Sequence, residues 1–161
     1  MSRPDFRVRT GHMGDYDALV MLFHDLDEFH RRARPDFFRR FDGPARTRRQ
    51  IEQWLIGPGS TVLVAEREPE VIGLAVLLTR TPSPFAGAAP RKVVELDNIV
   101  VHSDWRGREV GRQLLEATMR WAHRQSATHV EVAVHAFNAD ARRFYERFGF
   151  APSVDRLVIA A

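Results

Sequence analysis

The chain has 161 residues, of which 44% are hydrophobic and 28% are charged, and its formal net charge is +3 at pH 7. This length suits one globular domain over residues 1–161, large enough to bury a core without cross-links. The chain contains no cysteine, which excludes disulfides, cysteine-based metal sites and a thiol nucleophile. No apolar stretch approaches the ~20 residues that cross a bilayer, and no secretory pattern opens the chain, so we expect a cytoplasmic protein without membrane contact.

Almost all of the positive charge is arginine, because Lys92 is the only lysine. A nucleic-acid binder typically shows a basic face with interleaved aromatic residues, and residues 31–49 are the nearest approach to one. We therefore expect no nucleic-acid partner and favour an acidic or phosphate-bearing ligand. Nothing in the sequence has the spacing of metal ligands, so no metal is expected.

Alternating apolar residues predict strands, and apolar residues three and four apart predict helices. The first helix is expected to begin at Asp15 as its N-cap and to end before Pro35, which cannot continue it. The expected elements in chain order are a strand at 6–9, helices at 15–34 and 45–55, strands at 61–66 and 71–79, a loop at 82–90, a strand at 93–101, a helix from 111 to about 125, a strand at 129–137, a helix at 138–148 and a closing strand at 154–160.

The most informative stretch is VVELDNIVVHSDWRGREVG, residues 93–111. It reads as a buried strand, a short loop with arginine and glycine, and the start of an amphipathic helix. Backbone N–H groups at such a turn, together with the positive end of the helix dipole, form an anion site suited to a phosphate. By itself this signal is weak, because glycine near a helix start is common.

A second stretch, NADARRFYERFGF at residues 138–150, follows an alternating strand about thirty residues later. The two together resemble the GNAT superfamily of N-acetyltransferases. Arg106 and Gly111 match the ends of the family's turn pattern, but Glu109 stands where the family usually has its first glycine. The second pattern is matched by Asn138, Ala141, Phe144, Tyr145, Glu146, Gly149 and Phe150.

The resemblance implies a GNAT fold: a mixed, mostly antiparallel central sheet of about six to seven strands flanked by about four helices. It also implies that the strands at 93–101 and 130–137 splay apart, with the thioester arm of acetyl-CoA between them. Family members are often dimers, and the strand at 154–160 could contribute to a homodimer interface.

By the same resemblance, acetyl-CoA is the co-substrate, and its pyrophosphate meets the backbone of the turn. The residues expected to bind it are Ile99, Val100, Val101, Arg106, Gly107, Arg108, Glu109, Val110, Gly111, Arg112, Asn138 and Tyr145. A carboxylate near a pyrophosphate is unfavourable unless it points away, so Glu109 is expected to face solvent or to pair with an arginine. The two glycines could instead serve only the turn and helix packing.

The resemblance places Tyr145 as the proton donor to the departing thiolate, although a core aromatic with a hydrogen-bonded hydroxyl is the alternative. Asn138 resembles the family residue that hydrogen-bonds the cofactor arm, and it could also be a structural N-cap. Glu95 and Asp97 fall on one face of their strand if alternation holds. Glu95 is then a candidate general base, the pair could recognise the amine, or both could be solvated at a strand end.

The acceptor side is the least specified part of the site. In this fold the first two helices and their connector line it, which here offers Glu28, His30, Phe37 and Phe38. Phe37 and Phe38 could wall a pocket for an apolar or aromatic amine, or they could simply pack the connector. His135, on the strand before Asn138, is a second candidate facing the cleft.

These observations predict an acetyl-CoA-dependent N-acetyltransferase that acts by direct transfer within a ternary complex, with a small-molecule primary amine as acceptor. One alternative is acetylation of a protein N-terminus or lysine. A second is a non-catalytic acyl-CoA-binding regulatory module, for which Glu109 is the best support. A third is an arginine-rich nucleic-acid adaptor.

Overall fold

The structure, a computed structural model, describes residues 5–82 and 85–161. Its elements are β1 (Arg7–Thr10), a 3₁₀ turn (Met13–Asp15), α1 (Tyr16–Ala33), α2 (Arg48–Ile56), β2 (Ser60–Arg67), β3 (Glu70–Arg80), β4 (Val93–Val101), a second 3₁₀ turn (Ser103–Trp105), α3 (Val110–Arg124), β5 (His129–Val132) and α4 (Ala139–Phe148). None of the helices in the described part of the chain is long and apolar enough to cross a bilayer.

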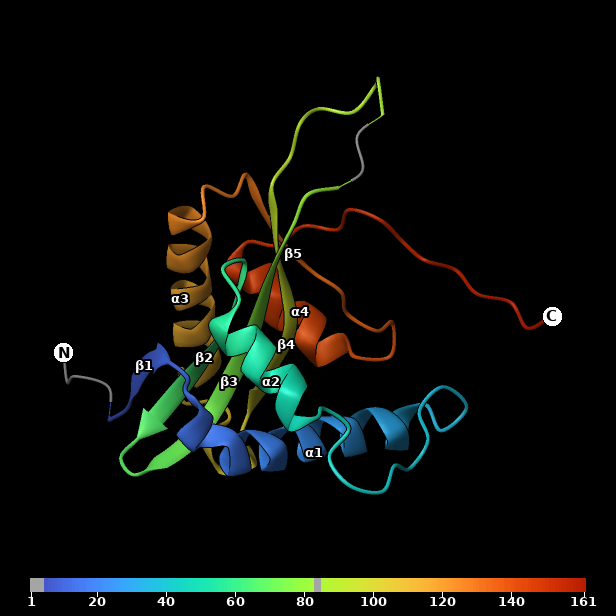
Figure 1. The fold of residues 1–161 in the computed structure, drawn as a ribbon. Coiled ribbons are helices and arrows are strands. Elements are labelled where there is room, and N and C mark those ends of the chain that lie inside the picture. The colour runs from blue at the N-terminus through green and yellow to red at the C-terminus, as the bar shows by residue number, and fades with distance from the viewer. Residues whose placement is uncertain (1–4, 83–84) are drawn as a thin grey trace.

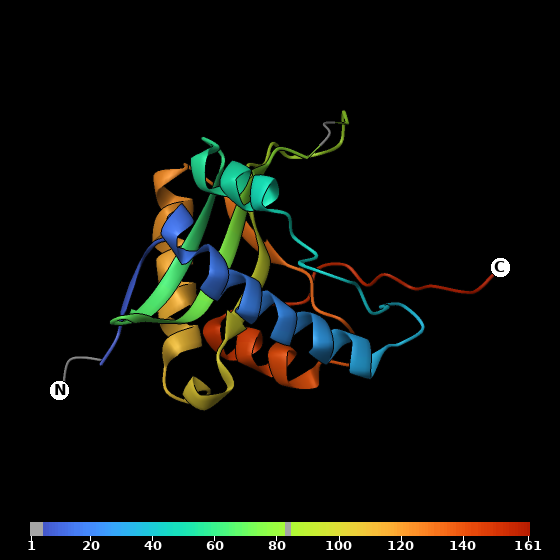
Figure 2. The ribbon, with the colours of Figure 1, turned by 60° about the horizontal axis from the view of Figure 1, so that its bottom comes forward.

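Five strands form one sheet in the order β1-β2-β3-β4-β5. The first four are antiparallel neighbours, and β5 runs parallel to β4. Helices α1 and α2 cover one face of this sheet, and α3 and α4 cover the other (Figures 1 and 2). The mixed, mostly antiparallel sheet between two helical layers confirms the expected fold class, with slightly fewer strands than expected.

Successive side chains of the central strands point to opposite faces of the sheet, so each of these strands contributes to two hydrophobic cores. Along β2, Val62 and Val64 pack with α1 and α2, whereas Leu63 and Ala65 pack beneath α3. Because both faces are covered, β2 and β3 are almost continuously buried, and their sequences are correspondingly apolar on both sides. The helix faces that meet them are the apolar stripes read from the sequence, such as Leu114, Leu115, Thr118 and Trp121 on α3.

Several expected boundaries are wrong. The closing strand at 154–160 does not form, and residues 151–161 are exposed and lack regular structure. The strand expected at 129–137 ends at Val132, because β4 turns away and leaves the next residues without a pairing partner. Helix α2 begins at Arg48 rather than near Ala45, since the Thr47 hydroxyl accepts a hydrogen bond from Gln50 N at 3.1 Å and caps it.

A β-bulge interrupts the register between β3 and β4. Leu77 pairs with Leu96 and Val76 pairs with Asn98, so Asp97 is the extra residue between them. Simple alternation is interrupted at this point, and the register places Glu95 and Asn98 on the same sheet face. Asp97 lines the same cleft as Glu95, so the bulge does not separate the two acids.

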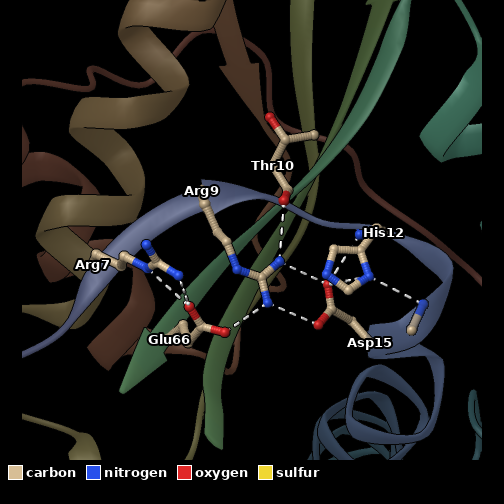
Figure 3. Close-up of polar contacts among 7 residues, drawn as sticks. Arg7, Arg9, Thr10, His12, Asp15 and Glu66 are labelled. Atoms are coloured by element: carbon tan, nitrogen blue, oxygen red, sulfur yellow. Dashed lines mark hydrogen bonds and ion pairs between the residues drawn. The ribbon is translucent and has the colours of Figure 1, made fainter. Parts of the chain in front are cut away.

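An ion-pair network joins β1, β2 and the start of α1 (Figure 3). Arg9 donates to both carboxylate oxygens of Asp15 and to Glu66, each at 2.9 Å, and Arg7 donates to Glu66 at 2.9 Å. Burial disfavours the charged Asp15, but hydrogen bonds from Arg9 and from the His12 N–H hold its pKa below the usual value. Hydrogen bonds from Arg9 and then Arg7 lower the pKa of Glu66 to about 2. Asp15 therefore precedes α1 without capping it through its side chain.

Candidate active site

The sheet opens where β4 and β5 part. They pair only over Val93–Leu96 and His129–Val132, and β4 then continues to Val101 paired with β3 alone. This divergence is the expected splay, and it leaves one side of the backbone at Ile99–Val101 without a strand partner among the described residues. A cleft of about 2120 Å³ runs through the opening. It is bordered by α1, by the connector between α1 and α2 (residues 34–47), by β4 and by the starts of α3 and α4.

The sequence-predicted site residues gather in this one cleft, with a single exception. Those that line it are Glu28, His30, Phe37, Phe38, Glu95, Asp97, Ile99, Val100, Val101, Arg106, Gly107, Glu109, Val110, Gly111, Arg112, His135, Asn138 and Tyr145. Arg108 does not line it, because its guanidinium lies over the Trp105 ring, 5.2 Å from the centroid.

The turn before α3 presents a row of backbone donors. Gly107 and Glu109 both have left-handed backbone, with φ of 72° and 68°. Within the described residues, the N–H groups of residues 107–112 make no hydrogen bond, and the first helical donor is Gln113 N, which reaches Glu109 O at 3.0 Å. Consecutive free N–H groups at a helix start form a concave anion site, and the helix dipole adds to it.

The Glu109 side chain does not occupy this anion site. It is 64% exposed, and Arg112 Nη1 lies 3.1 Å from its Oε2. The expectation that Glu109 would face solvent or pair with an arginine is met in both respects. Its backbone lies in the left-handed region that favours glycine, so Glu109 adopts a conformation that a glycine would adopt without strain.

Gly111 has a packing role in addition to any role toward a ligand. A Cβ at this position would lie 3.0 Å from Cζ and 3.3 Å from Cε2 of the Phe144 ring. The missing side chain thus lets α4 approach the first turn of α3. This contact ties the two sequence motifs together, because Phe144 precedes Tyr145.

Tyr145 lies in the wall of the cleft and is 7% exposed. Its ring packs against Phe144 and Phe150, with centroid distances of 5.4 and 5.6 Å. Burial raises the pKa of Tyr145 to about 12, since the phenolate would lose its hydration. The hydroxyl therefore stays protonated at neutral pH and can donate.

Asn138 begins α4 and caps it. Its side-chain oxygen accepts a hydrogen bond from Ala141 N at 3.2 Å. The cap uses the amide oxygen, so the amide NH₂ remains as a donor at the edge of the cleft. The N-cap role that the sequence left open is present, and it does not exclude contact with a ligand.

The carboxylates of the cleft differ in their partners. Glu95 is ion-paired to Arg80 at 2.6 Å, and Glu28 is paired to Arg31 at 2.6 Å along α1. Asp97, the bulge residue, is exposed and accepts a hydrogen bond from the Asn98 amide. Among the described residues, Asp97 has no arginine or lysine within ion-pair distance.

The end of the cleft that holds the residues expected to contact the acceptor is built from aromatic rings on three segments. The ring centroid of His30, on α1, lies 5.2 Å from that of His135 and 5.3 Å from that of Phe38. The His135 ring stacks on the Phe137 ring, with 5.4 Å between their centroids. Desolvation lowers the pKa of His135, and the nearby His30 and Arg34 add to this effect. Phe37, by contrast, is 52% exposed, with the Arg34 guanidinium 4.0 Å above its ring.

Comparison with known families agrees with this geometry. The profile of the acetyltransferase (GNAT) family matches residues 23–150. The chain belongs to the GNAT family. An uncharacterized N-acetyltransferase of Archaeoglobus fulgidus is 30% identical over 126 residues, which cover 75% of this chain and 83% of that protein.

Solved structures show the same GNAT fold. A tetramutant of the BH1408 protein of Bacillus halodurans has a TM-score of 0.89 at 25% identity, and the match covers 96% of this chain and 99% of that one. An aminoglycoside N-acetyltransferase, AAC(6')-Iy in complex with CoA, has a TM-score of 0.73 at 18% identity and covers 97% and 93% of the two chains. At that identity the second likeness concerns the fold alone.

Sequence reasoning missed Arg46, which links the connector after α1 to α1 and β4 beside the cleft. Its guanidinium donates to Asp27 on α1 at 2.6 Å and to Asn98 on β4 at 3.3 Å, and it lies 4.5 Å above the Phe23 ring. One arginine thus joins the connector to α1 and to the bulge. Nothing in the sequence distinguishes Arg46 from the other arginines at 31–49, since its partners lie 19 and 52 residues away.

Proposed function

We propose that this chain transfers the acetyl group of acetyl-CoA to the primary amine of a small molecule, by direct attack in a ternary complex. The observation that carries the proposal is the run of free N–H groups at residues 107–112, which opens into the cleft between β4 and β5. A pyrophosphate accepts several hydrogen bonds at once, and such a run supplies them better than any single side chain.

The cofactor side of the proposal uses residues already in place. The turn would hold the pyrophosphate, and Arg106 and Arg112 lie on the cleft to add positive charge. The backbone of Ile99–Val101 on the side away from β3 would hydrogen-bond the pantetheine arm and polarise the thioester carbonyl. The Asn138 amide would donate to the same arm from the opposite side of the opening.

The chemical step needs an unprotonated amine, a stabilised oxyanion and a proton for the departing thiolate. Tyr145 would donate that proton to sulfur, since its hydroxyl is protonated at neutral pH and lies in the cleft wall. Glu95 would accept the amine proton directly or through water. The Arg80 ion pair would hold Glu95 in position, and Asp97 would attract the ammonium form of the substrate.

The aromatic contacts at the end of the cleft opposite the turn favour a small molecule over a protein tail. The connector after α1 contacts the segment after β5 there, because the ring centroids of Phe38 and His135 lie 5.2 Å apart. A peptide would need an open trough at this point, whereas aromatic walls with a carboxylate nearby suit a compact amine. Modification of a protein N-terminus or lysine is thus the second candidate.

The test of the proposal is thermal unfolding with acetyl-CoA, free CoA or ADP, followed by thiol-release assays on an amine panel. Saturation at 100 times the Kd adds about 2.7 kcal/mol, which raises Tm by roughly 5–10 °C for a domain of this size. We expect this shift with acetyl-CoA and CoA, and thiol release with at least one small amine.

Two results would count against the proposal. If no Tm shift occurs at millimolar acetyl-CoA, the turn does not bind the cofactor and the proposed function is wrong. If Tm rises but neither small amines nor peptides release thiol, the chain is an acyl-CoA-binding module rather than an enzyme.

A further inference from the structure

A second, smaller cavity adjoins the cleft at the bulge of β4. This side pocket has a volume of about 430 Å³ and lies between the start of α2 and the bulge. Its wall includes Thr47, Gln50 and Trp54, none of which lines the cleft. Asp97 and Asn98 line both cavities. The bulge therefore places the Asp97 side chain where a ligand could extend from the cleft into the side pocket.

Asp97 is a carboxylate that lacks a cationic partner. Its Oδ2 accepts a hydrogen bond from the Asn98 amide at 2.5 Å. In the described part of the chain, its Oδ1 accepts no hydrogen bond, and no arginine, lysine or histidine lies within ion-pair distance. A carboxylate can accept several donors at once, and an ammonium group offers three.

The charges around the side pocket leave one negative charge unbalanced. Arg46 borders the pocket, but its guanidinium lies 2.6 Å from the Asp27 carboxylate and 3.3 Å from Asn98 Oδ1. Asp27 thus neutralises Arg46. Among the described residues that line the pocket, Asp97 is the other charged one. Its charge therefore favours a cationic ligand over an anionic one.

The remaining wall of the side pocket also suits an ammonium group. The half-buried Trp54 lines it and packs on Phe23, with 6.2 Å between the ring centroids. An indole ring attracts a cation that lies over its face. Gln50 adds a side-chain amide whose oxygen can accept from the same cation.

Resting on the proposed function, we propose that the acceptor is a diamine or a longer polyamine. One amino group, unprotonated, reacts beside Glu95 in the cleft. The second amino group, protonated, occupies the side pocket and pairs with Asp97.

The spacing of the two carboxylates agrees with such a molecule. The Cα atoms of Glu95 and Asp97 are two residues apart, at most roughly 7 Å along an extended strand, which a diamine with about four to six carbons between its nitrogens spans. Both side chains line the cleft, so the two amino groups can be held at the same time.

The transfer acetylates one nitrogen and leaves the other charged. The free amine nitrogen forms a bond to the thioester carbonyl carbon, and the carbon–sulfur bond breaks. The amine proton passes to Glu95, and the CoA thiolate takes the proton of Tyr145. The product is a monoacetylated diamine, and it is a poor acceptor for a second transfer because no ammonium is left for Asp97 when its remaining amine reacts.

The first test compares diaminobutane, with an amino group at each end, with butylamine in the thiol-release assay. We expect kcat/KM to be roughly tenfold or more higher for the diamine, the range of one charge-assisted hydrogen bond. Asp97→Asn should reduce this ratio to within about threefold of unity. Asp25→Asn changes another exposed carboxylate of the cleft, on α1, and should leave the ratio unchanged.

The second test places a positive charge in the side pocket. Gln50→Lys should abolish the preference for the diamine by repelling its ammonium group. Gln53→Lys, at an exposed position on α2 that does not line the pocket, should retain the preference. Mass spectrometry should find the monoacetylated diamine as the product until the diamine is exhausted.

A third measurement does not need turnover. Calorimetry with free CoA present should show diaminobutane binding at least tenfold more tightly than butylamine to the unmodified protein, and equally weakly to Asp97→Asn. Equal kcat/KM and equal affinity for the two amines would overturn the proposal. So would a diamine preference that survives both Asp97→Asn and Gln50→Lys.

The proposed function fails in a different way. It fails if acetyl-CoA gives no Tm shift or if no amine releases thiol, whereas this inference fails if amines are acetylated without regard to a second amino group.

Discussion

The Tyr145 hydroxyl is a single polar group in a part of the cleft wall where the neighbouring side chains are the aromatic rings of Phe144 and Phe150. Its ring is held by Phe144 and Phe150, so replacing the hydroxyl by hydrogen leaves the packing unchanged. We predict that Tyr145→Phe lowers kcat by roughly 100-fold or more, the range of a lost general acid. Acetyl-CoA affinity, measured by calorimetry, should stay within about twofold because the backbone donors at residues 107–112 are unchanged and only one of the groups expected to contact the cofactor is lost.

The matched control for that prediction is Tyr16→Phe, since Tyr16 is the chain's other tyrosine and lies at the start of α1. It should leave kcat unchanged. Equal loss of activity in both variants, or a Tyr145→Phe enzyme with full turnover, would remove the proton-donor role.

Glu109 combines a strained backbone with a charge beside the anion site. A left-handed backbone conformation costs a non-glycine residue about 1–2 kcal/mol. Glycine avoids this cost, but it loses about 0.5–1 kcal/mol more in backbone entropy on folding. We predict that Glu109→Gly raises the free energy of unfolding by about 0.5–1 kcal/mol. It should also tighten acetyl-CoA binding roughly two- to fivefold, because an exposed charge contributes about 0.2–1 kcal/mol.

Glu109→Gln separates the two effects. It removes the charge but keeps the strain, so affinity should rise without a gain in stability. Denaturant unfolding and calorimetry measure the two quantities, and a stability gain in the glutamine variant would contradict the strain explanation.

At the scale of elements, the Arg9 network holds the edge strand β1 and the entry to α1 against β2. The pKa of Glu66 is lowered from 4.5 to about 2 in the folded chain. A carboxylate with a depressed folded pKa stabilises the fold above its unfolded pKa, and this contribution is lost as pH falls through the folded value. Glu66 therefore stabilises the protein above about pH 4.5 and progressively less below it.

We predict that the Tm difference between the unmodified protein and Glu66→Gln is largest above pH 5 and closes as the pH is lowered toward 2. Glu52→Gln, an exposed carboxylate on α2, should show a small difference that changes little over the same range. A Glu66→Gln difference that is constant with pH would mean that Glu66 acts through packing rather than charge.

At the scale of the whole molecule, Arg46 in the connector after α1 joins that connector to α1 and to β4. We predict that Arg46→Ala loosens the connector and raises KM for the acceptor amine about five- to tenfold through lost positioning. Acetyl-CoA affinity should not change, since Arg46 lies away from the turn at residues 107–112.

Trypsin gives a second measurement of the same change. Cleavage at Arg39 and Arg40, both exposed in the connector, should be several times faster in Arg46→Ala because local opening becomes easier. Arg49→Ala removes an exposed arginine from α2 instead and should leave both the KM and the cleavage rate unchanged. Unaltered proteolysis in Arg46→Ala would show that the connector is held by its aromatic contacts alone.

The sequence by itself determined the order of the elements up to α4, the fold family and the position of the turn before α3. These depend on signals local in the chain: apolar periodicity, a glycine-containing helix start, and two motifs about thirty residues apart. Even the behaviour of Glu109 could be predicted, because the arginine that pairs with it lies only three residues away.

Only the tertiary structure decided what depends on partners distant in the chain. The bulge at Asp97 arises from the register of β3 against β4, so the alternation of a single strand could not show it. The role of Arg46 rests on contacts 19 and 52 residues away. The segment 154–160 has the composition of a strand, but a strand also needs a neighbour, and no strand of the described residues pairs with it. Local propensity selects a conformation, whereas pairing and packing depend on which residues the fold brings together.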